Sequence, residues 1–229
     1  MRRVVTLERG EQLTMSNASC NRIWVVLQGM VAICCGLSDG RRQIVELETS
    51  GNVVCGPASV DGSENWLEAM SDCTICELSL DGVTGPFENY PDLISDMFGL
   101  IHERLRENMS RLVTLGRLDS YERVAQFFYE IAVKTGQNRG NSTWVPLPMT
   151  REDIADYIGI NTETVSRVIS RLKKAGLVQF EGRNTYVVTD MEALKQRMPV
   201  VHQSHEEVAP SRPNGGGCPV HVKEAIHDR

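Results

Sequence analysis

The stretch that decides the fold lies between residues 150 and 188 and reads TREDIADYIGINTETVSRVISRLKKAGLVQFEGRNTYVV. Thr150 followed by Asp153 has the spacing of a capping box, so a short helix is expected to begin there. Gly159 then supplies a tight turn, and Asn161 can cap a second helix. A helix, a glycine turn and a second helix form the unit that lays its second helix in a DNA major groove about 12 Å wide. The order of these signals therefore predicts a helix-turn-helix.

The inward-facing residues of the two expected helices are apolar and recur at helical spacing. They are Ile154, Ala155 and Ile158 in the first helix and Val165, Val168, Ile169 and Leu172 in the second. The opposite face of the second helix carries Glu163, Ser166, Arg167 and Ser170. Between residues 162 and 174 four basic residues accompany one acidic residue, a local formal charge of +3 in a chain of net charge −6. Any DNA binding is therefore expected to come from this local patch.

A second signal follows the second helix. LVQF (177–180) and TYVV (185–188) flank Glu181-Gly182-Arg183-Asn184, which predicts a β-hairpin wing with Arg183 within reach of a phosphate. Some winged domains bind proteins instead of DNA. Because the exposed face carries base-reading residue types and no apolar patch, DNA is the favoured partner.

The composition limits the number of domains, the location and the cysteine chemistry that can be expected. With 229 residues, 41% hydrophobic and 24% charged, the chain is long enough for two small cores, so two domains are expected. No apolar stretch follows MRRVVTLERG and no run approaches about 18 apolar residues, which predicts a cytoplasmic protein without a membrane partner. Seven cysteines without a secretion signal indicate reduced thiols, a metal or a redox sensor rather than a disulfide framework.

The N-terminal third has the pattern of short β-strands. The runs IWVVL, MVAICC, RRQIVEL and CTICELSL are separated by turn signals such as Gln28-Gly29 and Ser38-Asp39-Gly40. Asp-Gly between β-rich runs is a hairpin signal, and several such strands at short spacing predict an antiparallel barrel or sandwich.

After Pro91 the apolar residues recur at three- and four-residue steps, which predicts a long helix that ends or bends near Gly116. Its apolar stripe comprises Ile94, Met97, Phe98, Ile101, Leu105, Met109 and Leu112. A small barrel alone cannot cover so continuous a stripe, so we expect the helix to pair with its twin in a dimer; packing wholly against its own domain is the alternative. Residues 119–133 are expected to form another helix, and TGQNRGNST (135–143) a polar loop.

Residues 150–178, TREDIADYIGINTETVSRVISRLKKAGLV, resemble the recognition segment of the CRP/FNR family of bacterial transcription regulators. LQGMVAI, SDGRRQIVEL and SGNVV resemble the sensor barrel of that family, and SYERVAQFF resembles its helix after the dimer helix. The implied fold is α+β: an antiparallel β-barrel of the cyclic-nucleotide-binding type, a double-stranded β-helix, at 1–90 and a dimerisation helix at 91–116. A winged helix-turn-helix at 117–197 and a flexible tail at 198–229 complete the chain.

The resemblance also implies a DNA site. Glu163, Ser166 and Arg167 have the E-x-x-S-R spacing of the FNR and FixK branch, whereas the cyclic-AMP receptor branch has an arginine where this chain has Thr162. The implied target is an inverted repeat whose half-sites are nearer TTGA than TGTGA. The partners implied are double-stranded DNA, a second copy of the chain and RNA polymerase.

The contacts are expected to divide by chemistry. Arg167 would pair with guanine, Glu163 would accept from cytosine and Ser166 would contact a neighbouring base, while residues nearby would bind phosphates. The full candidate set is Thr150, Arg151, Thr162, Glu163, Thr164, Ser166, Arg167, Ser170, Arg171, Lys173 and Arg183.

The sequence disfavours two of the family's effectors. A cyclic nucleotide needs an arginine at its phosphate, yet no Lys or Arg occurs from Gln43 to Glu103. An iron-sulfur cluster of the FNR type needs closely spaced cysteines ahead of the barrel, but the first cysteine is Cys20. Cys73 and Cys76, three apart on a strand, point to opposite faces and do not share a metal.

Three alternatives stay open. One is a haem- or thiol-based sensor of the same fold; haem commonly takes a histidine ligand, and no histidine lies in the barrel sequence. Another is a cupin-like metalloenzyme, although such a barrel normally needs a His/His/carboxylate metal set and this barrel sequence has no histidine; the chain is not expected to be an enzyme. In the tail, His202, His205, Cys218 and His221 have zinc-like spacing, against a leading interpretation of disorder.

Overall fold

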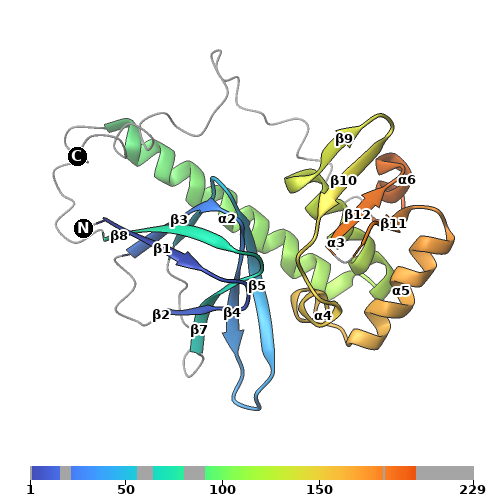
Figure 1. Cartoon of the computed structure of the whole chain (residues 1–229), viewed down its shortest axis with the longest axis horizontal. Helices are drawn as coiled ribbons and strands as arrows, with labels where there is room; N and C mark the ends of the chain where they lie inside the picture. Colours follow the sequence, from blue (N-terminus) through green and yellow to red (C-terminus); the bar gives the residue numbers. More distant parts are fainter. Residues whose placement is uncertain (1, 16–21, 56–63, 80–90, 183, 200–229) are drawn as a thin grey trace. The chain divides into compact units, whose positions relative to one another are not determined.

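The computed structural model describes residues 2–15, 22–55, 64–79, 91–182 and 184–199 (Figure 1). Two four-stranded antiparallel sheets make up the N-terminal region, which we call the barrel. Its strands are β1 (Arg2–Leu7), β2 (Gln12–Met15), β3 (Arg22–Gln28), β4 (Met30–Gly36), β5 (Arg42–Thr49), β6 (Val53–Cys55), β7 (Glu64–Ala69) and β8 (Cys73–Ser79). One sheet has the order β1-β8-β3-β6 and the other β2-β7-β4-β5. The antiparallel sheet fold predicted from the strand pattern is confirmed.

The alternating strand sequences explain why the two sheets pack face to face. Along β7 every second side chain is buried, with Leu67 at the centre. Leu67 joins Trp24 of β3, Val31 of β4 and Ile75 of β8 in one apolar cluster, so residues from both sheets share a core. Gly29 makes the turn between β3 and β4 at φ +93°, where a side chain would collide with the chain at Asp72.

Two helices follow the barrel. Helix α2 (Pro91–Arg117) is 27 residues long and continues one residue past Gly116, so the predicted stop is correct to within a residue. Helix α3 (Ser120–Thr135) begins with a capping box between Asp119 and Glu122 and ends two residues beyond the predicted range. No helix in the described part of the chain is long and apolar enough to cross a membrane.

The remaining elements pack with α3 in the C-terminal domain. They are β9 (Gln137–Arg139), β10 (Ser142–Pro146), α4 (Arg151–Ile158), α5 (Thr162–Lys174), β11 (Val178–Phe180), β12 (Thr185–Val188) and α6 (Met191–Lys195). A four-stranded antiparallel sheet has the order β11-β12-β10-β9. The hairpin of β11 and β12 is the predicted wing.

The prediction of a polar loop at 135–143 was wrong, because this segment contains β9 and the start of β10. Every side chain of β9 is exposed, so the strand has no apolar alternation that a sequence pattern can reveal. Its pairing partner β10 buries Thr143 and Val145 and pairs in turn with β12. The sheet thus imposes the strand conformation on a polar segment.

Aromatic side chains fill the core beneath α5. Phe128 of α3 packs edge to face against Tyr186 of β12 at 4.8 Å between ring centroids. The hydroxyl of Tyr186 donates to the main-chain oxygen of Phe128 at 2.7 Å, which satisfies the one polar atom that the ring buries. This core fixes α3, the sheet and the helix-turn-helix relative to one another.

Candidate DNA interface

Local interactions define where α4 begins and ends and where α5 begins. The Thr150 hydroxyl accepts from the amide of Asp153 at 3.1 Å, and the Asp153 carboxylate accepts from the amide of Thr150 at 2.7 Å. Gly159 ends α4 in the left-handed conformation, at φ 66°. The Asn161 side chain then accepts from the amide of Thr164 at 2.7 Å and begins α5. The predicted capping box, turn and cap are all confirmed.

The predicted faces of the two helices are confirmed as well. All seven apolar residues expected to face inward are buried: Ile154, Ala155, Ile158, Val165, Val168, Ile169 and Leu172. Tyr157 is also buried, which the sequence analysis missed; its ring packs against Phe127 at 5.6 Å between centroids. The polar side of α5 is therefore the side presented to solvent.

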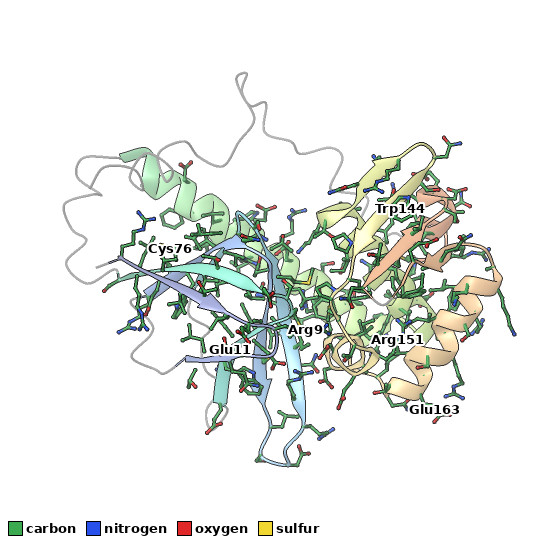
Figure 2. The ribbon with its side chains drawn as sticks, viewed as in Figure 1. Arg9, Glu11, Cys76, Trp144, Arg151 and Glu163 are labelled. Atoms are coloured by element: carbon green, nitrogen blue, oxygen red, sulfur yellow. The ribbon has the colours of Figure 1, made fainter. Side chains whose placement is uncertain are left out.

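Glu163, Ser166, Arg167 and Ser170 are all exposed on that side. Figure 2 shows Glu163 on the side of α5 that faces away from the sheet. The Arg167 guanidinium donates to the Thr164 hydroxyl at 3.0 Å, and the Ser170 hydroxyl donates to the main-chain oxygen of Ser166 at 2.9 Å. One hydrogen bond orients Arg167 along the surface of α5 and leaves most of its five N–H donors free.

Other candidates surround this face. Thr150 and Thr162 are exposed at the first turns of α4 and α5, while Thr164 is half-buried. Arg171 and Lys173 are exposed near the C-terminal end of α5. The half-buried Arg151 begins α4, and burial lowers the pKa of its guanidinium. The structure thus brings these candidates together around one helix.

Five candidates fall outside what the structure describes. They are Arg183 in the wing and the tail residues His202, His205, Cys218 and His221. For Ile94 and Met97 of the α2 stripe only the main chain is described.

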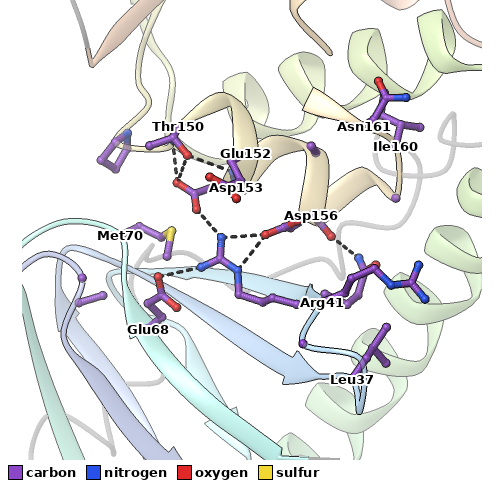
Figure 3. A pocket seen from close by; sticks show the side chains of 18 of the residues that line it. Leu37, Arg41, Glu68, Met70, Thr150, Glu152, Asp153, Asp156, Ile160 and Asn161 are labelled. Atoms are coloured by element: carbon purple, nitrogen blue, oxygen red, sulfur yellow. Dashed lines mark hydrogen bonds and ion pairs between the residues drawn. The ribbon is translucent and has the colours of Figure 1, made fainter. Parts of the chain in front are cut away.

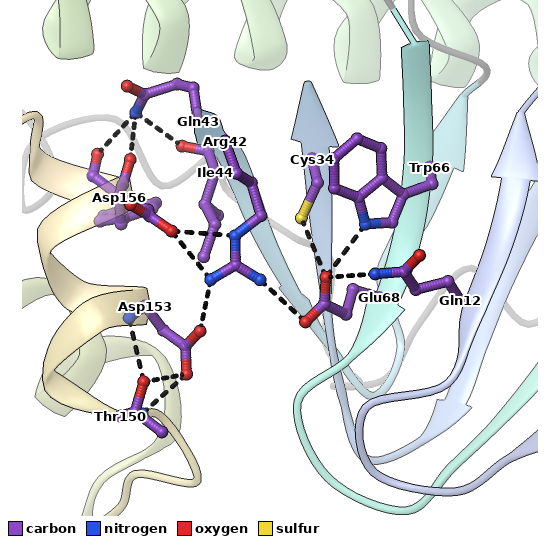
Figure 4. A network of polar contacts seen from close by, with 11 residues as sticks. Gln12, Cys34, Arg42, Gln43, Ile44, Trp66, Glu68, Thr150, Asp153 and Asp156 are labelled. Atoms are coloured by element: carbon purple, nitrogen blue, oxygen red, sulfur yellow. Dashed lines mark hydrogen bonds and ion pairs between the residues drawn. The ribbon is translucent and has the colours of Figure 1, made fainter. Parts of the chain in front are cut away.

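A polar network joins the barrel to the first helix of the helix-turn-helix (Figure 4). The guanidinium of Arg42 on β5 contacts Glu68 of β7 at 2.8 Å, Asp153 at 2.6 Å and Asp156 at 2.9 Å. Burial lowers the pKa of Arg42, but the three carboxylates outweigh burial and raise it above its ordinary value. The Gln43 amide donates to the main-chain oxygens of Asp156 and of Tyr157. Asp153 therefore serves both as the capping-box partner of Thr150 and, with Asp156, as a link between α4 and the barrel.

The cleft beside Arg42 does not suit an anion. Its volume is about 1090 Å³, and Glu68, Glu152, Asp153 and Asp156 contribute to its lining (Figure 3). Arg9, Arg41 and Arg42 also line it, but carboxylates already bind the guanidinium groups of Arg41 and Arg42. A phosphate in the cleft would meet more negative than available positive charge.

A second arginine is occupied in the same way. Arg104 of α2 contacts the fully buried Glu48, lies 3.2 Å from Glu46 and donates to the main-chain oxygen of Val53 at 2.7 Å. Arg42 and Arg104 border the stretch of sequence that lacks lysine and arginine. Within this stretch Arg42 pairs with Glu68, and Arg104 pairs with Glu46 and Glu48.

The cysteines described in the barrel behave as apolar residues. Cys34, Cys73 and Cys76 are buried, and Cys35 beside them is half-buried. The Cys34 thiol lies 3.9 Å from a carboxylate oxygen of Glu68. Burial, followed by the charge of Glu68, raises the pKa of Cys34 to about 12.

Cys34 is therefore expected to resist alkylation in the folded protein. Because the thiolate is the reactive form, a pKa near 12 leaves only about one molecule in ten thousand reactive at pH 8. Peptide mass spectrometry after iodoacetamide treatment measures this, with Cys35 as the internal control and urea-unfolded protein as the reference for full reaction. Equal rates at Cys34 in the folded and unfolded protein would contradict the expectation.

The chain matches known proteins over both of its halves. Residues 122–197 match the Crp-like helix-turn-helix domain, and residues 4–90 match the cyclic nucleotide-binding domain. The nitrogen fixation regulation protein FixK of Bradyrhizobium diazoefficiens is 31% identical over 177 residues, covering 77% of this chain and 74% of that protein. FixK of Azorhizobium caulinodans is 29% identical over 195 residues, covering 82% of this chain and 76% of that protein. The solved structure of FixK2 from Bradyrhizobium japonicum has a TM-score of 0.75 and 25% identity, covering 87% of this chain and 98% of that chain.

Proposed function

The chain belongs to the CRP/FNR family of DNA-binding transcription regulators, and from this premise we propose that it binds, as a homodimer, an inverted repeat with TTGA-like half-sites. It is not an enzyme, since its relatives are transcription regulators. The proposed domain organisation is a barrel at 1–90, a dimerisation helix at 91–116, a winged helix-turn-helix at 117–197 and a tail at 198–229. The proposed location is the cytoplasm, with RNA polymerase as a further partner.

The exposed face of α5 is the observation that carries the proposal. Arg167 presents two parallel donors to O6 and N7 of guanine, a pair of acceptors that no other base offers at this position. Glu163 accepts from the amino group of cytosine, and Ser166 contacts an adjacent base. Exposure of all three in the first two turns of α5 supports this assignment, since the N-terminal part of a recognition helix meets the base edges.

The apolar stripe of α2 supports the dimer. The stripe side chains that the structure describes are exposed in the single chain: Phe98 is 68% exposed, Leu105 59%, Met109 63% and Leu112 65%. A continuous row of exposed large apolar residues along one helix is typical of an interaction surface. A second copy of α2 offers the same row, and pairing of the two helices removes both from water.

Binding to a designed duplex tests the proposed function. Fluorescence anisotropy would compare a duplex with two inverted TTGA half-sites, centred one helical turn apart, with a duplex whose half-sites are scrambled. We expect the first to bind at least about 10³-fold more tightly at the same salt concentration. Equal affinities would contradict sequence-specific recognition.

Cyclic AMP is expected to leave this DNA affinity unchanged. Arg42 and Arg104 already bind carboxylates, so the phosphate of the nucleotide would find no free cation in the stretch they border. Isothermal titration calorimetry measures the binding of the nucleotide to the protein. The same method measures the duplex affinity with and without the nucleotide. Micromolar binding of the nucleotide, or a tighter duplex complex in its presence, would contradict the expectation.

A further inference from the structure

The basic side chains beside α5 have different partners from those of Arg42 and Arg104. Carboxylates of the barrel bind Arg42 of β5 and Arg104 of α2. Beside α5, aromatic rings take that place: the guanidinium of Arg171 lies 4.6 Å from the ring centroid of Tyr121. The guanidinium of Arg151 and the ammonium of Lys173 lie 4.4 and 5.7 Å from the ring centroid of Phe180.

The three charged groups have no other partner in the described part of the chain: neither an ion pair nor a side-chain hydrogen bond involves Arg151, Arg171 or Lys173. A carboxylate would occupy the N–H donors of a guanidinium and would repel an approaching phosphate. An aromatic ring attracts the cation through its face and leaves the N–H donors unoccupied. These groups are thus held in place while their donors stay available for an anion.

The rings lie on the two flanks of the recognition face. Successive residues of a helix turn by about 100°, so Arg171 and Lys173 project on opposite sides of the row formed by Glu163, Ser166 and Arg167. Tyr121 belongs to the first turn of α3, whereas Phe180 ends β11 at the start of the wing.

Both rings are themselves fixed. Tyr121 and Phe180 are partly buried against the core of the C-terminal domain. Phe180 makes edge contact with Phe128 at 6.0 Å between centroids. Each ring is therefore already ordered, so the contact costs the conformational entropy of the basic side chain and not that of the ring as well.

We propose that Tyr121 and Phe180 are positioning residues for backbone binding: they hold Arg171 on one flank of α5, and Arg151 and Lys173 on the other, for the phosphates of the duplex. This inference rests on the proposed binding of DNA by α5. Tyr121 and Phe180 should therefore affect the affinity for every duplex equally. They should not affect which bases are preferred, because phosphates carry no sequence information.

A double-mutant cycle on the designed duplex tests the Tyr121 flank. Tyr121→Leu should weaken binding about two- to five-fold on TTGA-containing and scrambled duplexes alike, the usual contribution of a cation over a ring. Tyr121→Phe, which keeps the ring, should restore the affinity. In the Arg171→Ala background Tyr121→Leu should have no further effect, and Arg171→Ala itself should lower the salt slope by about one unit.

The chain offers a matched control. Arg139 lies over Trp144 at 5.0 Å, the same kind of pair in the same domain. The sheet order places its strand β9 at the opposite edge from β11, which carries Phe180 (Figure 1). Trp144→Leu should therefore leave DNA affinity unchanged, although it removes a ring from beneath an arginine.

If the wild type binds the designed duplex specifically, two results would contradict the role of the rings and leave the proposed function unchanged. In one, Tyr121→Leu weakens binding equally with and without Arg171, which would indicate general destabilisation of the fold. In the other, Arg171→Ala weakens binding whereas Tyr121→Leu does not. Failure of the wild type to prefer the designed duplex would instead overturn the proposed function, and this inference with it.

Discussion

Replacing Leu105 with glutamate is expected to convert the protein to a monomer and to weaken binding to a two-half-site duplex about 10²- to 10⁴-fold. Leu105 lies in the middle of the exposed stripe of α2, between Ile101 and Met109. In a helix pair this position would bury the new carboxylate against apolar side chains, at a large desolvation cost. Once the dimer dissociates, each half-site must be bound independently, and the gain from linked binding is lost.

Analytical ultracentrifugation gives the oligomeric state, and anisotropy on the same samples gives the affinity. Ile101→Glu should behave like Leu105→Glu. Glu103→Lys changes the charge on the exposed surface of the same helix outside the stripe, so it should leave the protein dimeric. If both stripe variants remain dimers, the interface lies elsewhere.

Arg167→Ala should cost about 1–3 kcal/mol on the preferred duplex, roughly a 5- to 150-fold loss of affinity, and should abolish discrimination at the guanine of each half-site. Arg167 is exposed and oriented by Thr164, so its removal leaves the core of the domain intact. Affinities for duplexes with the guanine replaced by each other base measure the effect. Arg167→Lys should rescue little, because an ammonium lacks the planar fork that matches two acceptors.

Lys173→Ala is the control for this prediction, since it should weaken all duplexes about equally and lower the salt slope by about one unit. A guanine preference that persists in Arg167→Ala would show that another residue makes the specific contact.

The parts of the fold predicted from the sequence are those that local chemistry determines. Thr150, Gly159 and Asn161 act on groups within four residues along the chain, so the spacing of residue types is sufficient to place the helix ends. The buried faces of α4 and α5 follow from helical periodicity for the same reason.

The parts that the sequence analysis missed depend on residues distant along the chain. Arg42 meets Asp153 and Asp156 across more than 100 positions, and Arg111 of α2 donates to the Tyr157 hydroxyl of α4 at 2.7 Å. No local pattern encodes such contacts. The rings beneath Arg151 and Arg171 were missed likewise, because Phe180 and Tyr121 lie on other elements than the cations they support.

Selection from a pool of random duplexes tests the central claim most directly, because it assumes no site. The wild-type protein, incubated with the pool at physiological salt and recovered with its bound DNA, is expected to enrich an inverted repeat of TTGA-like half-sites about one helical turn apart. A parallel selection with Arg167→Ala should return a motif without a preference for guanine at that position of each half-site. A wild-type pool without a common motif, or the same motif from both proteins, would contradict recognition of DNA through the exposed face of α5.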